Sequence, residues 1–329
     1  MLHPHFFILL AMLLFRTAQT APLATVSTSK CACPQIAELS PPMLRATNIA
    51  VCAIFRNEAR DLFEWVFYHW LLGFDNFLLY DNESTDAPER VLAPFIAKGI
   101  VVLKKWPGRK SQHTTPQWRS IADCKRVARR NNISWLAQFD IDEFLVLQPL
   151  NADKCIDPRR DESLSSELHA ILMALETRRV AGMVANRFDF GTNGVNRREV
   201  HQLQTTTFTR RGVSPSLHGK PLSLVRKTKR FTGFHKIAVA SNWSVITCKP
   251  STGCPFVFYH YRTRSLQECI DKSADPRLPA SNWRVKAGKH ICSGKQDLEL
   301  LDVTIADSSL MACVATTAAR QLPRDPSLE

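Results

Sequence analysis

Asp140 and Asp142 are separated by one position and follow an apolar run, 135–139, that is typical of a buried strand. In an extended chain this spacing places both carboxylates on one side, with Ile141 between them on the other. Paired carboxylates suit a hard divalent cation such as Mn²⁺ or Mg²⁺, and the cation can bridge to the oxygens of a diphosphate. Because a bound metal stabilises the charge that develops on a departing nucleoside diphosphate, the motif predicts a metal site for group transfer.

Two further polar segments also follow apolar runs. Asp81 and Asn82 could bind a ribose or the edge of a pyrimidine, and a polar turn that caps the next helix explains them equally well. Arg56 and Glu58 could form a charged pair that shapes a nucleotide pocket, or a surface ion pair that contributes little to stability. The local pattern leaves both alternatives open.

The elements that must position these side chains alternate between two patterns. Short apolar runs predict four strands, at 48–55, 76–80, 100–103 and 135–139. Amphipathic runs predict three helices, at 61–73, 88–98 and 117–130. The first helix is expected to begin with a capping box of Asp61 and Glu64 and to end at Gly73.

This alternation predicts an α/β fold with a mostly parallel, Rossmann-like sheet and helices on both faces. Ligands of such sheets bind beyond the carboxyl ends of the strands, where the polar segments fall, so we expect these side chains to converge. The second half of the chain is less regular. It predicts a helix at 164–176 and, at 180–245, short strands that extend the same sheet.

The N-terminus has an apolar run at 6–15, which has the length of a signal-peptide core and is followed by small residues. Segment 1–24 is therefore predicted to be a signal peptide or a short signal-anchor. A flexible stem at 25–47, one catalytic domain at 48–322 and a disordered tail at 323–329 are expected to follow. We expect the protein in the secretory pathway, in the Golgi lumen, as a type II membrane-anchored protein or secreted after cleavage.

The ten cysteines of the chain fit an oxidising compartment and predict several disulfides. Cys248 and Cys254 are the expected local pair, whereas Cys52, inside an apolar strand, is expected to be a free buried thiol. Glycosylation sequons begin at Asn82, Asn132 and Asn242. Because the first lies at the predicted site, we expect it to carry no glycan.

The formal net charge of +13 and the pI of about 9.5 favour anionic partners, such as nucleotide phosphates, acidic glycans or membrane surfaces. Nucleic acid is not an expected partner, because the basic residues match no known nucleic-acid-binding module. A non-catalytic secreted lectin or polyanion-binding protein is the alternative class, and the basic run 226–230 would serve it.

A series of ordered motifs resembles glycosyltransferase family 92 over roughly residues 48–265. These motifs are the segments 51–58, 64–69, 73–77, 80–86 and 140–144, with later blocks at 190–194, 219–220, 235–236 and 260–265. The resemblance implies a GT-A-like fold, a nucleotide-sugar donor such as UDP-galactose or another UDP-hexose, a divalent metal, and inverting transfer to a glycan acceptor. The basic run after Lys220 departs from the family pattern and predicts a different choice of acceptor.

By the same resemblance, Asp140, Asp142 and His260 would hold Mn²⁺ or Mg²⁺, with His235 as the competing histidine. The residues implied for the nucleotide sugar are Arg56, Glu58, Asp81, Asn82, Asp140, Lys220 and Arg262. A structural imidazole is the alternative for either histidine, and a solvated charge is the alternative for Lys220 and Arg262.

The block at 190–194 is expected to shape the acceptor pocket through Phe190, Gly191, Asn193 and Gly194, because glycine allows a sugar to approach closely. The alternative is an ordinary glycine-asparagine turn. Inverting transfer also needs a general base, and Asp189, which precedes this block, is the candidate. An exposed strand carboxylate without a catalytic role is the alternative for Asp189.

Overall fold

The computed structural model describes residues 33–39, 47–108, 115–147, 163–249, 254–275, 292, 300–302 and 308–321. The predicted signal segment, most of the predicted stem and the predicted tail lie outside these residues. None of the helices in the described part is long and apolar enough to cross a bilayer.

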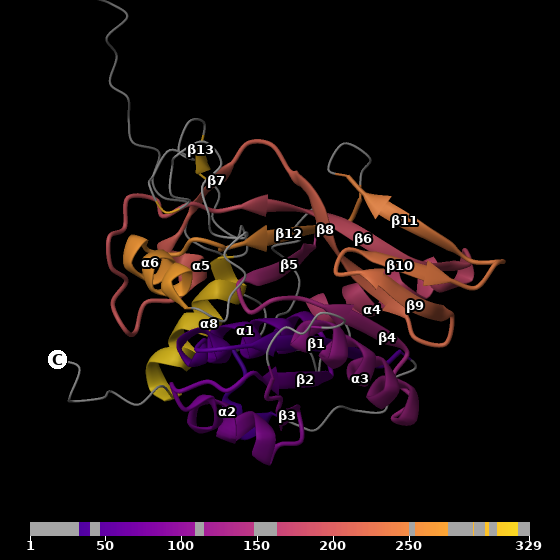
Figure 1. Cartoon of the computed structure of the whole chain (residues 1–329), viewed down its shortest axis with the longest axis horizontal. Coiled ribbons are helices and arrows are strands. Elements are labelled where there is room, and N and C mark those ends of the chain that lie inside the picture. The colour runs from indigo at the N-terminus through magenta and orange to yellow at the C-terminus, as the bar shows by residue number, and fades with distance from the viewer. Residues whose placement is uncertain are drawn as a thin grey trace, which may run out of the picture.

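The first half of the chain forms four parallel strands in the order β3-β2-β1-β4 (Figure 1). Their bounds are Ile49–Phe55 for β1, Asn76–Asp81 for β2, Val101–Lys105 for β3 and Trp135–Gln138 for β4. The connecting helices are α1 at Ala59–Leu72, α2 at Pro88–Ala97 and α3 at Pro116–Arg130. All seven elements lie within a few residues of their predicted positions, because each has a regular apolar pattern of its own.

The second half extends this sheet with strands of both directions. Beyond β4 the order continues β8-β6-β12-β5, and β11 pairs with β6. Their bounds are Glu143–Leu147 for β5, Val180–Asp189 for β6, Ser216–Leu224 for β8, Ser244–Cys248 for β11 and Phe256–His260 for β12. Strand β8 runs antiparallel to β4 and β6, whereas β12 and β11 run parallel to β6. The mixed sheet is mostly parallel, and the predicted α/β class with a mostly parallel sheet is confirmed.

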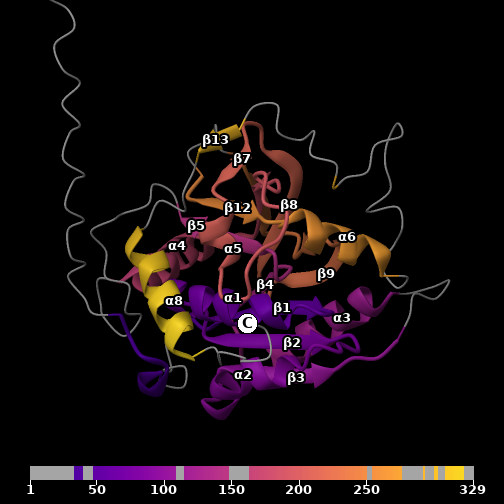
Figure 2. The same ribbon diagram turned by 90° about the vertical axis from the view of Figure 1, so that its left-hand side faces the viewer.

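Helices cover both faces of the sheet (Figures 1 and 2). Alternate residues of β1 face opposite sides: Val51 belongs to the core beneath α1, and Cys52 belongs to the core beneath α3. Helix α4 (Leu164–Thr177), at the predicted position, and helix α8 (Ser308–Gln321) contact α1 on its side of the sheet. The hairpin of β9 (Thr228–Gly233) and β10 (Lys236–Val239) forms a separate two-stranded sheet.

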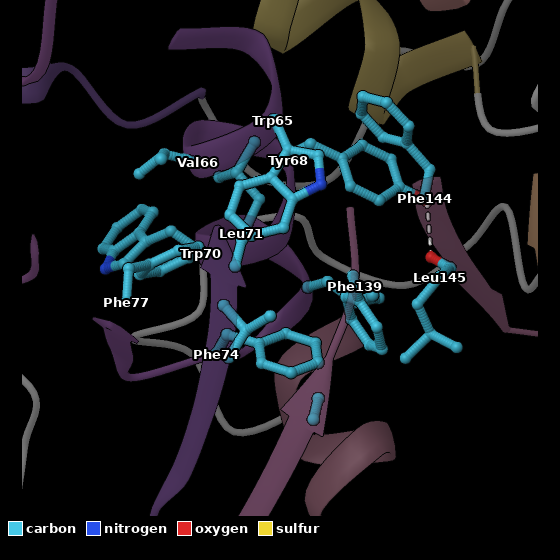
Figure 3. Close-up of a cluster of buried hydrophobic side chains, with 14 of the residues drawn as sticks. Trp65, Val66, Tyr68, Trp70, Leu71, Phe74, Phe77, Phe139, Phe144 and Leu145 are labelled. Atoms are coloured by element: carbon cyan, nitrogen blue, oxygen red, sulfur yellow. Dashed lines mark hydrogen bonds between the residues drawn. The ribbon is translucent and has the colours of Figure 1, made fainter. Parts of the chain in front are cut away.

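The α1 side of the core is built from aromatic rings (Figure 3). The indole of Trp65 donates a hydrogen bond of 2.9 Å to the carbonyl of Glu143, and the hydroxyl of Tyr68 donates one of 2.9 Å to the carbonyl of Leu145. Both side chains are almost fully buried. These two hydrogen bonds attach helix α1 to the backbone of β5. Because β5 directly follows Asp140 and Asp142, they also hold the end of the loop that carries the two aspartates.

The start of α1 differs from the prediction. Glu58 is the N-cap residue, and its side chain makes no capping hydrogen bond. Asp61 instead pairs with Arg198, at 2.7 Å, and the buried carboxylate of Glu64 accepts hydrogen bonds from the 204–205 backbone. The capping box is therefore wrong, because distant donors bind both carboxylates. The predicted end is confirmed: Gly73 adopts a φ of 114°, which favours glycine.

Four disulfides lie within the described residues, and the predicted Cys248–Cys254 pair is one of them. The others join Cys33 to Cys313, Cys52 to Cys124, and Cys269 to Cys292. The prediction that Cys52 is a free thiol is wrong. Its side chain faces α3, where Cys124 meets it, and an apolar strand pattern carries no information about that partner.

Candidate active site

The sheet itself brings the main candidate residues together. The Asp140-Ile141-Asp142 loop joins β4 to β5, and His260 is the last residue of β12. In the strand register His260 lies opposite Asp189 at the end of β6 and opposite Glu143 at the start of β5. Residues about 70 and 120 positions apart thus become neighbours through backbone pairing alone.

Asp142, His260 and Asp189 form a chain of contacts. Oδ1 of Asp142 lies 3.5 Å from Nε2 of His260, whose Nδ1 donates a hydrogen bond of 2.5 Å to Oδ1 of Asp189. Asp142 and His260 are each about 5% exposed, whereas the Asp189 side chain is 37% exposed. Burial opposes the charge of His260, but the carboxylates of Asp142 and Asp189 outweigh it and raise the pKa of His260 to about 9.

The other aspartate of the motif faces a lysine. Nζ of Lys220, on β8, lies 2.6 Å from Oδ2 of Asp140 and 3.0 Å from Oε2 of the fully buried Glu143. Burial opposes the charge of Lys220, but these two carboxylates raise its pKa. A Cβ at Gly219 would lie 2.2 Å from the carbonyl oxygen of Ala185, so glycine is needed for β8 to lie this close to β6.

Asp140 and Lys220 also line a pocket with about 290 Å³ of empty space, open to solvent. Its walls are β1, the end of β4, the first turns of α3 and the tip of the β9–β10 hairpin; the other lining residues are Cys52, Ala53, Ile54, Gln117, Ser120, Ile121, Gln138, Phe139 and Phe234. The pocket lies where the α/β topology predicts a ligand, beyond the carboxyl ends of parallel strands.

A second lysine contacts the site, and no local pattern predicted it. Nζ of Lys272, on α6 (Leu266–Ala274), lies 3.2 Å from Oδ2 of Asp142 and 3.0 Å from Oε1 of Glu58. Arg264 pairs with Glu58 at 2.6 Å. Burial would raise the pKa of Asp142, but Lys272 and His260 hold it well below its ordinary value. The Ser265-x-x-Glu268 pattern predicts the start of a helix but not where Lys272 points.

The predicted pair of Arg56 and Glu58 does not form. Arg56 binds Asp275, at 3.0 Å, and the carbonyl of Asn82, at 2.9 Å, whereas Glu58 faces Lys272. Arg56 and Glu58 thus pair with different residues and not with each other. Their role in nucleotide binding stays a prediction.

Asp81 and Asn82 lie at the end of β2, as predicted, and outside the walls of the pocket. The buried carboxylate of Asp81 pairs with Lys105, at 2.8 Å, and accepts a hydrogen bond of 2.8 Å from the backbone of Ser84. The amide of Asn82 donates to the carbonyl of Trp106 at 2.8 Å. Their nucleoside contact, and the absence of a glycan at Asn82, stay predictions.

The expected acceptor loop divides into a buried and an exposed part. Phe190 is 1% exposed and stacks on Tyr261 with ring centroids 4.4 Å apart. Its ring therefore packs in the core, and a role of Phe190 in acceptor binding stays a prediction. Gly191 is buried as well, whereas Gly194 is exposed. Asn193, at a φ of 51°, binds the backbone of Arg210 through both side-chain atoms, which favours the turn alternative.

The competing histidine lies elsewhere. His235 is at the tip of the β9–β10 hairpin, and its Nδ1 is 2.7 Å from the carbonyl of Gly219. Arg262 is half-buried beside the site, and Asp189 is among the charges that act on it. Of the two histidines, His260 is the one that contacts a motif aspartate.

The side chains of the site can be compared with the ligands that a divalent cation needs. Within the described ranges, no cluster of three His, Cys, Asp or Glu side chains is arranged to hold a metal. Two ligand atoms nevertheless face each other: Nε2 of His260, and Oδ1 of Asp142, which is buried and has no hydrogen-bond partner. Metal-bound histidines usually donate their other nitrogen to a carboxylate, as His260 does to Asp189. A carboxylate such as that of Asp142 is a ligand type that suits Mn²⁺ or Mg²⁺, whereas imidazole is a common ligand of other transition metals.

Comparisons with known proteins point to one family. Residues 47–170 match the family model described as Glycosyltransferase family 92. A glycosyltransferase family 92 protein of Oryza sativa subsp. japonica is 34% identical over 125 residues, which are 36% of this chain and 20% of that protein. One from Ricinus communis is 34% identical over 101 residues, 30% of this chain and 17% of that protein. The matched parts thus span a fifth or less of these relatives.

Distant structural similarities accompany this match. S. aureus TarS 1-349 in complex with UDP-GlcNAc has a TM-score of 0.36 and 8% identity, with 72% of this chain and 69% of that chain covered. Glucosyl-3-phosphoglycerate synthase from Mycobacterium tuberculosis in complex with phosphoglyceric acid has a TM-score of 0.30 and 17% identity, with 60% and 64% covered. Residues 47–170, which hold the four leading parallel strands and both motif aspartates, are therefore the part of the chain that is similar to glycosyltransferase family 92.

Proposed function

We propose that this protein is a metal-dependent glycosyltransferase, which moves a hexosyl group from a nucleotide-sugar donor, a UDP-hexose such as UDP-galactose, to a glycan acceptor with inversion. The observation that carries the proposal is the convergence of Asp142, His260 and Asp189 at the carboxyl ends of the strands. A lectin or polyanion-binding protein has no need for a buried carboxylate beside an imidazole that a second carboxylate orients.

In this proposal Asp142 and His260 would hold Mn²⁺ or Mg²⁺, together with Asp140. Asp189 keeps the His260 ring oriented, with its proton on Nδ1 and Nε2 directed at Asp142. The bound cation would supply neutralisation of the charge that develops on the departing diphosphate. Lys220 pairs with Asp140 and Lys272 pairs with Asp142, so each motif aspartate has a cation beside it.

Transfer requires one bond to form and one to break at the anomeric carbon of the sugar. The acceptor hydroxyl oxygen attacks this carbon and loses its proton to a base, while the bond to the diphosphate oxygen breaks and the electron pair leaves with the diphosphate. Asp189 stays the candidate base. Its contact with His260 gives it a second candidate role, which the Discussion separates from the first.

We also propose that the protein works in the lumen of the secretory pathway, in the Golgi, anchored or secreted. Four disulfides support an oxidising compartment. One of them, Cys52–Cys124, crosslinks β1 to α3 directly beneath the pocket.

The test is a screen of donor hydrolysis by the purified full chain over a panel of nucleotide sugars, with Mn²⁺ and with a chelator. We expect one UDP-hexose to be hydrolysed with metal, and the activity to be lost with chelator and in Asp142→Asn. UDP binding by calorimetry and the circular dichroism spectrum separate loss of the site from loss of the fold. Donor hydrolysis that is unchanged in a folded Asp142→Asn protein, or in chelator, would contradict the proposed metal site.

A further inference from the structure

The basic run at 226–230 lies next to the basic face of α3. Three contacts join the helix and the β9–β10 hairpin in order along both elements. Arg129 donates a hydrogen bond of 3.1 Å to the carbonyl of Thr228, Lys125 donates to the carbonyl of Lys229, and the rings of Trp118 and Phe234 pack with centroids 4.9 Å apart. Figures 1 and 2 both show β9 alongside α3.

These contacts define a surface that we call the basic track. Its exposed cations are Arg129, Arg130, Lys229, Arg230 and Lys236. None of the five has a carboxylate partner in the described part of the chain, whereas Arg126 and Arg226 nearby are paired with Asp123 and Glu176. Crowding of like charges also acts here: burial and the charge of Arg129 lower the pKa of Lys125.

The track leads to the pocket. Its length along α3, from Arg130 to Trp118, is twelve residues, which corresponds to about 18 Å at the rise of an α-helix. At the pocket end, Gln117 and Ser120 of α3 and Phe234 of the hairpin line the wall that Asp140 and Lys220 share. The half-buried Trp118–Phe234 pair thus lies between the cations and the pocket.

We propose that the basic track binds a linear anionic glycan, with sulfate or carboxylate groups on successive sugars, and that this glycan is the acceptor chain of the proposed transferase. Exposed cations that have no carboxylate partner in the described part of the chain, on a helix and a hairpin in contact, fit a linear polyanion, and the aromatic pair offers an apolar face to a sugar ring. The inference rests on the proposed function, because it places the end of the bound chain at the pocket that Asp140 and Lys220 line.

Binding of defined probes to the full chain tests this inference. We expect a heparin-derived octasaccharide to bind more tightly than uncharged maltooctaose, and its affinity to fall as NaCl rises from about 50 to about 200 mM. The double variant Arg130→Glu/Arg230→Glu is expected to weaken octasaccharide binding by about tenfold or more, since both side chains are exposed and neither pairs with a carboxylate among the described residues.

The matched control is Arg90→Glu/Arg197→Glu, which changes the net charge equally at exposed positions on α2 and in the 190–200 loop. An equal loss of octasaccharide affinity in the two double variants would overturn the inference, because the effect would then come from net charge alone. Binding to phosphatidylserine vesicles without binding to the octasaccharide would also overturn it.

Mn²⁺-dependent UDP binding, measured on the same preparations, separates this inference from the proposed function. We expect the track variant to bind UDP as the unmodified protein does and to show a higher KM for a sulfated acceptor at an unchanged kcat. Retained UDP binding without octasaccharide binding overturns the acceptor inference alone. Absent UDP binding overturns the proposed function.

Discussion

Asp189 has two candidate roles, and they predict opposite results when its carboxylate is removed. If Asp189 orients His260, then Asp189→Ala should weaken the binding of Mn²⁺ and of UDP in the presence of Mn²⁺. If it is instead the general base, binding should be preserved while transfer to the acceptor is lost. From the geometry we expect the first pattern, because the carboxylate lies 2.5 Å from Nδ1 of His260.

The magnitude follows from this contact. A hydrogen bond to a charged group contributes about 1.5–3 kcal/mol, and removing the carboxylate partner of a metal-bound histidine typically costs about 10–100-fold in metal affinity. The His260 side chain is 7% exposed but that of Asp189 is 37% exposed, so solvent screens the contact and the lower part of the range applies. We therefore expect about a 10–30-fold loss of Mn²⁺ affinity in Asp189→Ala. Asp189→Asn, which keeps an acceptor oxygen but no charge, should lose less.

The assay is calorimetric titration of Mn²⁺ and of UDP, with donor hydrolysis measured on the same samples. The control is Asp271→Asn, which removes an equal charge from an exposed position on α6. Mn²⁺ affinity of Asp189→Ala within about twofold of that of the unmodified protein, together with a loss of transfer of about a hundredfold or more, would refute the orienting role and favour the base.

Two further predictions concern stability. Burial lowers the pKa of His69 to about 3, so the stability that the neutral ring provides is present above its ordinary value of 6.5 and is lost as pH falls from 6.5 toward 3. Between about pH 7.5 and pH 5, we expect the free energy of unfolding of the unmodified protein to fall by about 2 kcal/mol more than that of His69→Gln, measured by urea denaturation. An equal fall in the two proteins would contradict this. The crosslink between Cys52 and Cys124 closes a loop of 72 residues, and that between Cys248 and Cys254 a loop of 6. Replacing the first pair by serine is expected to cost about 2–5 kcal/mol and the second about 2 kcal/mol less, so the reverse order in urea unfolding would argue against the loop-entropy explanation.

The sequence alone predicts the parallel half of the sheet well. Strands β1 to β4 and the helices between them have apolar periods that are local properties of the chain, and Gly73 ends α1 because a left-handed residue is needed there. The spacing of Asp140 and Asp142 is likewise local. So is the tendency of polar residues to follow parallel strands, which predicts a candidate site at the edge of the sheet where these strands end.

Only the tertiary structure decides which partner each of these side chains meets. Asp61 and Glu64 have the spacing of a capping box, yet they bind donors more than 130 residues away. Phe190 has the exposure of a core residue because Tyr261 covers it, and Lys272 contacts Asp142 from 130 positions further along the chain.

The physical reason is the range of the interactions. Periodicity and turn chemistry depend on neighbours within a few residues, and the sequence by itself determines them. Ion pairs, disulfides and ring contacts depend on the order and direction of strands such as β8 and β12, which no local pattern encodes. The sequence therefore determined the two aspartates and the strands that present them, and the fold decided that His260, Asp189 and two lysines surround them.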